Sequence, residues 1–166
     1  MELTDLVDIN DLKKFVEGIN SFGLTGTIYK KDNFILIKSE RSANDLCPII
    51  KSGKDSVVIC SSAQQRLAKM AHDSKKPAVD QCDAGFVKFV LPIFIKDEFL
   101  GTAGGCGCLL DDASVDSFYV GKQIGKNEKD VETLSADVCR ITSNKLSEVI
   151  EYVQENIDRF SLPLHP

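Results

Sequence analysis

The sequence lacks the features that mark secreted, membrane-spanning and nucleic-acid-binding proteins. Residues 1–8 are acidic, and no basic segment followed by an apolar one opens the chain, so no secretory signal is indicated. No run approaches the roughly 18 apolar residues that a membrane span needs. Lysine and arginine form no long cluster, and 25 acidic against 20 basic side chains give a net charge of −5. We therefore expect a cytoplasmic protein that binds neither membranes nor nucleic acid.

Histidine is also scarce, which restricts acid–base and metal chemistry. His72 falls late in a helical pattern, and His165 lies in the tail. A cysteine–histidine nucleophilic pair would have to use His72. No C-x-x-C pair provides the spacing of a zinc knuckle. This scarcity favours a binding or sensory role over an enzyme.

The composition is otherwise that of an ordinary globular protein. A chain of 166 residues with 43% hydrophobic and 27% charged residues fits one domain, spanning residues 1–166. A domain of this length buries about 70% of the surface that its unfolded chain exposes. It therefore needs no disulfide or metal to fold.

Hydrophobic periodicity predicts an α+β fold with an antiparallel sheet and covering helices. Leu12, Phe15 and Val16 recur at helical spacing. Helices are predicted at residues 8–22, 57–73, 127–137 and 143–160, with a short partly helical segment at 42–51. Strands are predicted at residues 25–29, 34–38, 79–82, 86–95 and 99–103. We expect a core over about residues 8–110 and a helical C-terminal extension over about 111–160.

The strongest strand signal is the apolar run at residues 86–95. Pro92 interrupts it, which favours an edge, a bulge or a strand beside a bound group, because proline donates no hydrogen bond to the ladder. The glycine-rich segment at residues 104–107 follows the return strand. Such a segment is not expected inside an ordinary strand, and it permits a kink or the close approach of a ligand.

Six cysteines are the most distinctive content of the chain. If Cys47, Cys60, Cys82 and Cys106 meet, their thiolates could hold zinc or an iron–sulfur cluster. Each could equally be a small buried apolar residue, or a redox-sensing thiol. A cytoplasmic location disfavours disulfides, and Cys139 is most simply a core residue. The Cys47-Pro48 dipeptide also occurs in haem-sensing segments, but it is common by chance, so haem is not indicated.

Four landmarks together carry a family resemblance. They are Leu46-Cys47, Cys60, the segment 82–86 leading to Leu91-Pro92-Ile93, and Leu100-Gly101 leading to the turn at 104–108. This pattern resembles the PocR-type sensory domain over roughly residues 15–110. The resemblance implies a PAS-like or GAF-like fold with a ligand pocket between the sheet and its helices. It also implies sensing of a small molecule, which in the name-giving transcription regulators is a small diol.

The expected function is therefore that of a stand-alone sensory module without catalytic residues. Its ligand would contact an apolar wall and two glycines, namely Phe86, Phe89, Leu91, Gly104 and Gly105. The four thiols named above would surround the bound small molecule or hold a metal centre. The chain shows no DNA-binding helix-turn-helix and no kinase, so the output would pass through a signalling partner or a homodimer. The alternative is a small thiol-dependent redox enzyme that uses Cys82 or Cys106.

Overall fold

The fold is α+β, as the sequence predicts. The computed structural model describes residues 1–162. Its elements follow one another as η1 (Leu3–Asp5), α1 (Ile9–Asn20), β1 (Thr25–Tyr29), β2 (Ile35–Lys38), α2 (Leu46–Ser52), α3 (Val57–Ser74), β3 (Ala78–Gln81), β4 (Val87–Ile95), β5 (Glu98–Leu110), α4 (Ser117–Ile124), α5 (Glu128–Leu134), β6 (Arg140–Ile141) and α6 (Ser143–Phe160). The sheet has the order β2-β1-β5-β4-β3, all antiparallel, and β6 adds to β5 in parallel.

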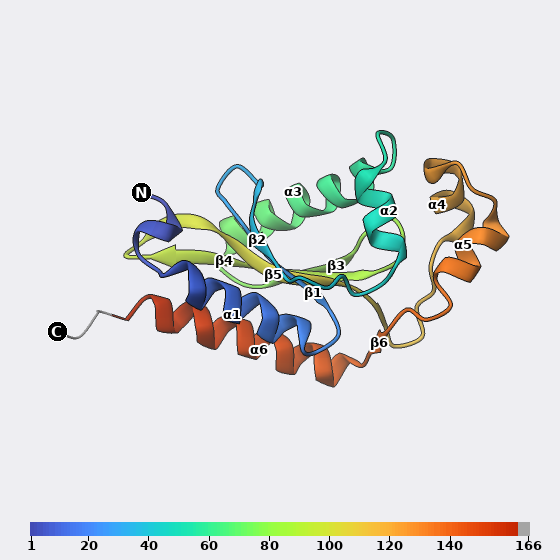
Figure 1. The fold of residues 1–166 in the computed structure, drawn as a ribbon. Helices are drawn as coiled ribbons and strands as arrows, with labels where there is room; N and C mark the ends of the chain where they lie inside the picture. Colours follow the sequence, from blue (N-terminus) through green and yellow to red (C-terminus); the bar gives the residue numbers. More distant parts are fainter. Residues whose placement is uncertain (163–166) are drawn as a thin grey trace.

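Helices cover both faces of this sheet (Figure 1). α1 and α6 lie side by side on one face, whereas α2 and α3 lie on the other. α4 and α5 pack against each other at one end of the molecule. No helix among residues 1–162 is long and apolar enough to span a membrane.

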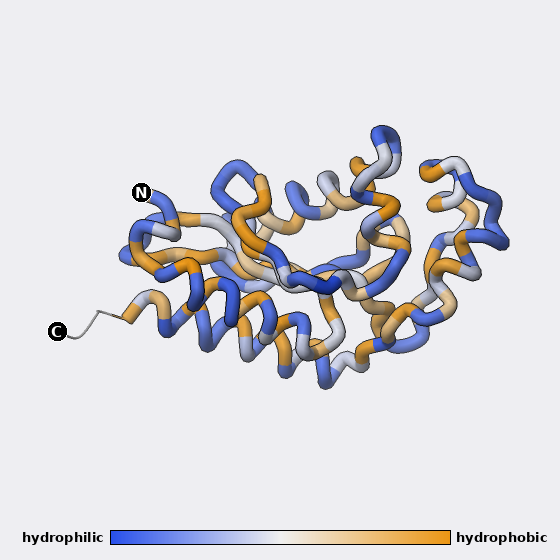
Figure 2. Tube along the Cα trace, viewed as in Figure 1, coloured by the Kyte–Doolittle hydropathy of each residue, from blue (hydrophilic) through white to orange (hydrophobic). Residues whose placement is uncertain are grey.

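The face below α1 and α6 contains the main apolar core. α1 buries Leu12 and Ile19 there, and α6 buries Val149 and Val153 against the same strands. Both helices alternate apolar and polar residues along their length (Figure 2), so each turns one face inward and one outward. α6 is therefore part of the main core, while α4 and α5 form the part of the predicted extension that lies outside it.

Pro92 occupies an edge position, which is one of the three alternatives that the sequence left open. β3 pairs with β4 only as far as Val90, so β4 has a single neighbour from Leu91 onward. On that side the ladder requires no donor, and proline is tolerated.

The prediction for the glycine-rich segment was wrong in one respect: β5 continues through it to Leu110. Two local features make this compatible with a strand. The β4–β5 register shifts between Val87 and Lys88, and Gly107 adopts a φ of +103° at this bulge, a conformation that favours glycine. A Cβ atom on Gly105 would lie 2.9 Å from Phe89 and 3.1 Å from Ile19. Glycine there allows α1 to approach the sheet closely.

The expectation that all cysteines stay reduced is also corrected. Cys108 and Cys139 form a disulfide, with their Cα atoms 4.9 Å apart and 31 residues apart in sequence. The parallel pairing of Leu109 with Arg140 brings their chain neighbours Cys108 and Cys139 together. The bond ties β5 to the segment before α6. Cys47, Cys60, Cys82 and Cys106 remain free.

Candidate functional site

The two faces of the sheet differ in chemistry. Side chains alternate between the faces along each strand, and Val87 and Phe89 of β4 belong to the core under α1 and α6. Lys88 between them faces α2 and α3. The same alternation turns several polar or small residues of β1 and β5 toward these helices, namely Thr25, Thr27, Tyr29, Thr102, Gly104 and Cys106. A buried polar face therefore lies beneath α2 and α3, and we call it the α2/α3 face.

Hydrogen bonds confirm this assignment. The Nε2 atom of Gln64 on α3 donates to Thr102 Oγ1 at 3.1 Å. The backbone N–H of Ala43, just before α2, donates to Thr25 Oγ1 at 2.8 Å. The hydroxyls of β1 and β5 thus bind α3 and the segment that leads into α2.

Lys88 is the most unusual residue of this face. Its side chain is only 7% exposed, and its Nζ atom lies 5.2 Å from the centroid of the Tyr29 ring. Burial acts to lower the pKa of Lys88. Cys106, Tyr29 and Cys60 act in the opposite direction, so the pKa lies above its ordinary value. Lys88 is therefore an ammonium ion at neutral pH, beside an aromatic ring that favours a cation.

The free thiols approach the same region from four elements. Cys47 lies on α2, Cys60 on α3, Cys82 after β3 and Cys106 on β5. Cys47 belongs to one core cluster, and Cys60 and Cys82 pack against it. Burial raises the pKa of these three thiols, and the charge of Cys106 acts in the same direction on each. Within residues 1–162, however, no three histidine, cysteine or acidic side chains are arranged to hold a metal ion.

Burial makes the thiols poor nucleophiles. It raises the pKa of Cys47 to about 12 and that of Cys60 to about 11, and it also raises the pKa of Cys82. The thiolate is the reactive and metal-binding form of cysteine. These three side chains are therefore neutral thiols at neutral pH.

Asn44 fixes α2 over the sheet. Its Oδ1 atom accepts hydrogen bonds from the backbone N–H groups of Leu46 at 2.9 Å and Cys47 at 2.7 Å. Its Nδ2 atom donates to the carbonyl oxygen of Gly107 at 2.8 Å. One side chain thus caps α2 and joins it to the bulge of β5.

Gln64 supplies an acceptor that is not used. It is 3% exposed, and its Nε2 atom also donates to Asn33 Oδ1 at 3.3 Å. Its Oε1 atom is buried without a partner among the described residues. Cys60 lies one helical turn before Gln64, on the same face of α3. The unused acceptor therefore borders the thiol cluster.

The predicted ligand-contact residues are divided between separate regions. Phe89 and Leu91 lie in the core under α1 and α6. Phe86 lies in a second core with residues of α2, α3, α4 and α5, which includes Cys47 and has Cys60 and Cys82 packed against it. Gly105 faces α1. Gly104 shares the α2/α3 face with Cys106, and Phe86 packs with Cys47, Cys60 and Cys82.

Sequence reasoning missed Lys88, Lys51, Tyr29 and Gln64. Lys88 carried a usable signal, because it is the single charge in the apolar strand run at residues 86–95. A lysine is almost never fully buried unless it is paired. The other three become neighbours only through the fold.

His72 takes no part in the site. Its ring lies 4.7 Å from that of Phe99 and its Nδ1 atom 3.0 Å from Asp73, near the C-terminal end of α3. This agrees with the prediction of a helix-end side chain. His165 lies outside the described residues.

Comparison with protein families decides what kind of domain this is. The model of the sensory domain found in PocR matches residues 5–161. The chain belongs to this family. The match includes α6, which fits the place of that helix in the main core of the PocR domain. Neither the curated proteins nor the solved structures yielded a match.

Proposed function

We propose that this PocR domain is a sensory module that binds a small molecule at the α2/α3 face. The family supports a sensory role for the domain. The observation that carries the location is Lys88, a buried cation beside the Tyr29 ring and opposite Cys106 in the β4–β5 register. On the same face, the Oε1 atom of Gln64 is buried without a partner among the described residues. Buried polar groups normally have partners, and a ligand would supply one.

A screen of small metabolites by thermal shift tests this proposal. Compounds that bind should raise the melting temperature of the unmodified protein. A Cys60→Phe variant places a larger side chain beside the other thiols of the α2/α3 face and should abolish these shifts. The control is Met70→Phe, because Met70 lies on the same helix and is 49% exposed. The proposal fails if no compound shifts the melting temperature, or if Cys60→Phe keeps the shifts.

A metal centre held by Cys47, Cys60, Cys82 and Cys106 stays a prediction. The packing of Cys60 and Cys82 against the core cluster of Cys47 favours it. Ligation would require all four to lose their protons and to move closer together. Iron, zinc and sulfide analysis of protein purified without oxygen tests it, with Cys82→Ser and Cys106→Ser as variants. Metal that is bound stoichiometrically and lost in both variants would replace the small-molecule proposal.

The thiol-dependent enzyme is the weaker alternative. The raised pKa of Cys82 opposes a nucleophilic role, and His72 lies beside Phe99 and Asp73 rather than beside a thiol.

We further propose that the signal leaves the domain through a partner protein or a second copy of the chain. The apolar face of α6 is used by the core, so a contact through this helix would use its outward polar face. A cytoplasmic location likewise stays a proposal. Because disulfides are rare in that compartment, the oxidation state of Cys108 and Cys139 inside cells tests it.

A further inference from the structure

Two lysines of the α2/α3 face have no counter-ion. No carboxylate oxygen of residues 1–162 lies within 4.0 Å of the ammonium of Lys88 or Lys51. Every other lysine of the sheet is more exposed than Lys88. An ammonium that is removed from water without a carboxylate is costly for the folded protein.

The two lysines converge on the same neighbours. Cys106, Tyr29 and Cys60 raise the pKa of both. Lys51 lies at the end of α2 and Lys88 on β4, so the two cations reach the same neighbours from different elements. At neutral pH Cys47 and Cys60 are protonated, which leaves the region with an excess of positive charge.

The remaining polar groups of the α2/α3 face indicate a second feature of the ligand. Gln64 Oε1 is an acceptor that lacks a donor, and it lies one turn of α3 from Cys60. A hydroxyl group on the partner would satisfy it. Around these polar groups lie the Tyr29 ring and the thiols, which suit a short carbon skeleton.

We propose that the ligand of this face is a small organic carboxylate bearing a hydroxyl group, with its carboxylate paired to Lys88 and Lys51. The inference rests on the proposed function and names the class of ligand. A neutral diol would leave both ammonium groups without a counter-ion. An inorganic phosphate has no carbon skeleton to contact the Tyr29 ring and the thiols.

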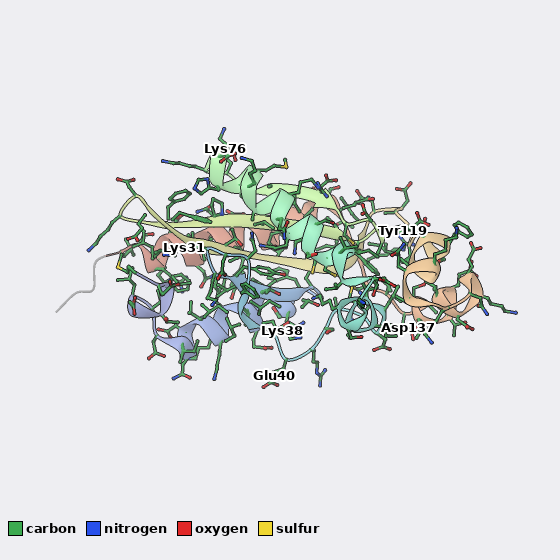
Figure 3. All side chains as sticks on the ribbon, turned by 90° about the horizontal axis from the view of Figure 1, so that it is seen from above. Lys31, Lys38, Glu40, Lys76, Tyr119 and Asp137 are labelled. Atoms are coloured by element: carbon green, nitrogen blue, oxygen red, sulfur yellow. A yellow bond between two sulfur atoms is a disulfide. The ribbon has the colours of Figure 1, made fainter. Side chains whose placement is uncertain are left out.

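Binding of lactate and 1,2-propanediol to the full chain tests the proposed ligand class. The two compounds differ mainly in that lactate has a carboxylate where 1,2-propanediol has a hydroxymethyl group. Calorimetry should show lactate binding that Lys88→Met weakens at least tenfold. The control is Lys38→Met, which removes an exposed lysine from the edge strand β2 (Figure 3) and should leave the affinity unchanged. Inorganic phosphate and 1,2-propanediol should bind far more weakly than lactate.

Two outcomes overturn the carboxylate and leave the sensory proposal standing. The first is that 1,2-propanediol binds more tightly than lactate and binds equally well to Lys88→Met. The second is that acetate, propionate, lactate and pyruvate all fail to bind while the metabolite screen finds another ligand that Cys60→Phe abolishes. If the screen also finds nothing, both proposals fall.

A melting experiment without ligand distinguishes two roles for Lys88: binding a ligand carboxylate, or forming an ion pair with Cys106 that stabilises the fold. Lys88 and Cys106 are direct partners in the β4–β5 register, so a Cys106 thiolate is the competing counter-ion. If Lys88 awaits a ligand, Lys88→Met should melt at the same temperature as the unmodified protein or higher. A melting temperature several degrees lower, together with slower alkylation of Cys106 by iodoacetamide, would show that the two residues pair and would overturn the inference. Lys51→Met provides a second, less buried variant for the binding measurement.

Discussion

At the scale of single residues, Lys88 is the observation on which the proposed site rests. β4 is apolar along its whole length apart from this residue, and the fold places the charge under two helices instead of in water. Gln64 is a second buried polar residue: its Nε2 atom donates a hydrogen bond to Thr102, but its Oε1 atom accepts none among the described residues. An apolar residue would pack at lower cost at either position. Both residues therefore support the proposed ligand site.

The buried thiols predict a loss of stability at alkaline pH. Burial raises the pKa of Cys47 from 9.0 to about 12 and that of Cys60 to about 11. Below pH 9 both are protonated in the folded and the unfolded chain, and their contribution is fully present. Above pH 9 the unfolded chain loses these protons first, so the free energy of unfolding falls by about 1.4 kcal/mol per pH unit for each thiol.

Urea unfolding at pH 8 and pH 10 measures this effect. The decrease should be smaller in Cys47→Ala than in the unmodified protein, because one of the two thiols is removed. An equal decrease in both proteins would show that Cys47 does not contribute.

Gly105 is predicted to be a packing residue. A Cβ atom there would lie 2.9 Å from Phe89 Cε1 and 3.1 Å from Ile19 Cγ2, so Gly105→Ala should destabilise the protein by about 1–3 kcal/mol. Thermal unfolding measures the change. Phe89→Leu provides the second arm of a double-mutant cycle, since a smaller side chain relieves the contact. Strictly additive effects would show that Gly105 and Phe89 are not coupled.

At the scale of elements, α2 depends on one side chain for its position. Asn44 caps the helix through two backbone N–H groups and joins it to Gly107. We expect Asn44→Ala to destabilise the protein by about 2 kcal/mol, from the lost cap and the lost hydrogen bond to β5. Cys47, in the first turn of α2, should then be alkylated faster.

Asn44→Asp is the matched control for this prediction. A carboxylate keeps the acceptor that caps α2 but removes the donor to Gly107, so an intermediate loss is expected in urea unfolding. If Asn44→Asp and Asn44→Ala are equally destabilised, the contact with β5 rather than the cap positions α2.

β5 illustrates how an element can contradict the local preference of its residues. Gly104, Gly105 and Gly107 predict an interruption, yet the strand continues from Glu98 to Leu110. It lies in the middle of the sheet, where β1 and β4 bond both of its edges. Ladder hydrogen bonds and close packing of α1 outweigh the entropy that glycine loses in a strand. The intrinsic strand propensity of the residues includes neither the ladder hydrogen bonds nor the packing of α1.

At the scale of the whole molecule, the Cys108–Cys139 disulfide joins the sheet to the segment that leads into α6. A bond that closes a loop of about 31 residues restricts the unfolded chain and contributes about 3–4 kcal/mol in the chain-entropy description. Cys139→Ala should therefore lower the melting temperature under oxidising conditions. Reductant should remove most of the difference between the two proteins.

Thiol titration in denaturant provides the direct measurement. The oxidised protein should show four reactive thiols, corresponding to Cys47, Cys60, Cys82 and Cys106. Six reactive thiols in protein that was never exposed to reductant would contradict the bond.

The sequence by itself determined the helices and strands that have strong periodicity. The helix predicted at residues 143–160 matches α6, and the strand pair at residues 25–38 matches β1 and β2. The position of Pro92 favoured an edge as one of three alternatives, and β4 has a free edge there. The family resemblance rested on local cysteine and glycine segments and is confirmed over most of the chain. These features are local, so they are encoded in residues that are close in sequence.

Only the tertiary structure decided which chemistry gathers at the α2/α3 face. Tyr29, Lys51, Cys60, Lys88 and Cys106 come from five different elements, and no spacing along the chain relates them. The disulfide likewise depends on the parallel pairing of β5 with β6, a two-residue strand with no periodic signal. Both are set by strand order and by alternation between the faces of the sheet, which are long-range properties of the fold.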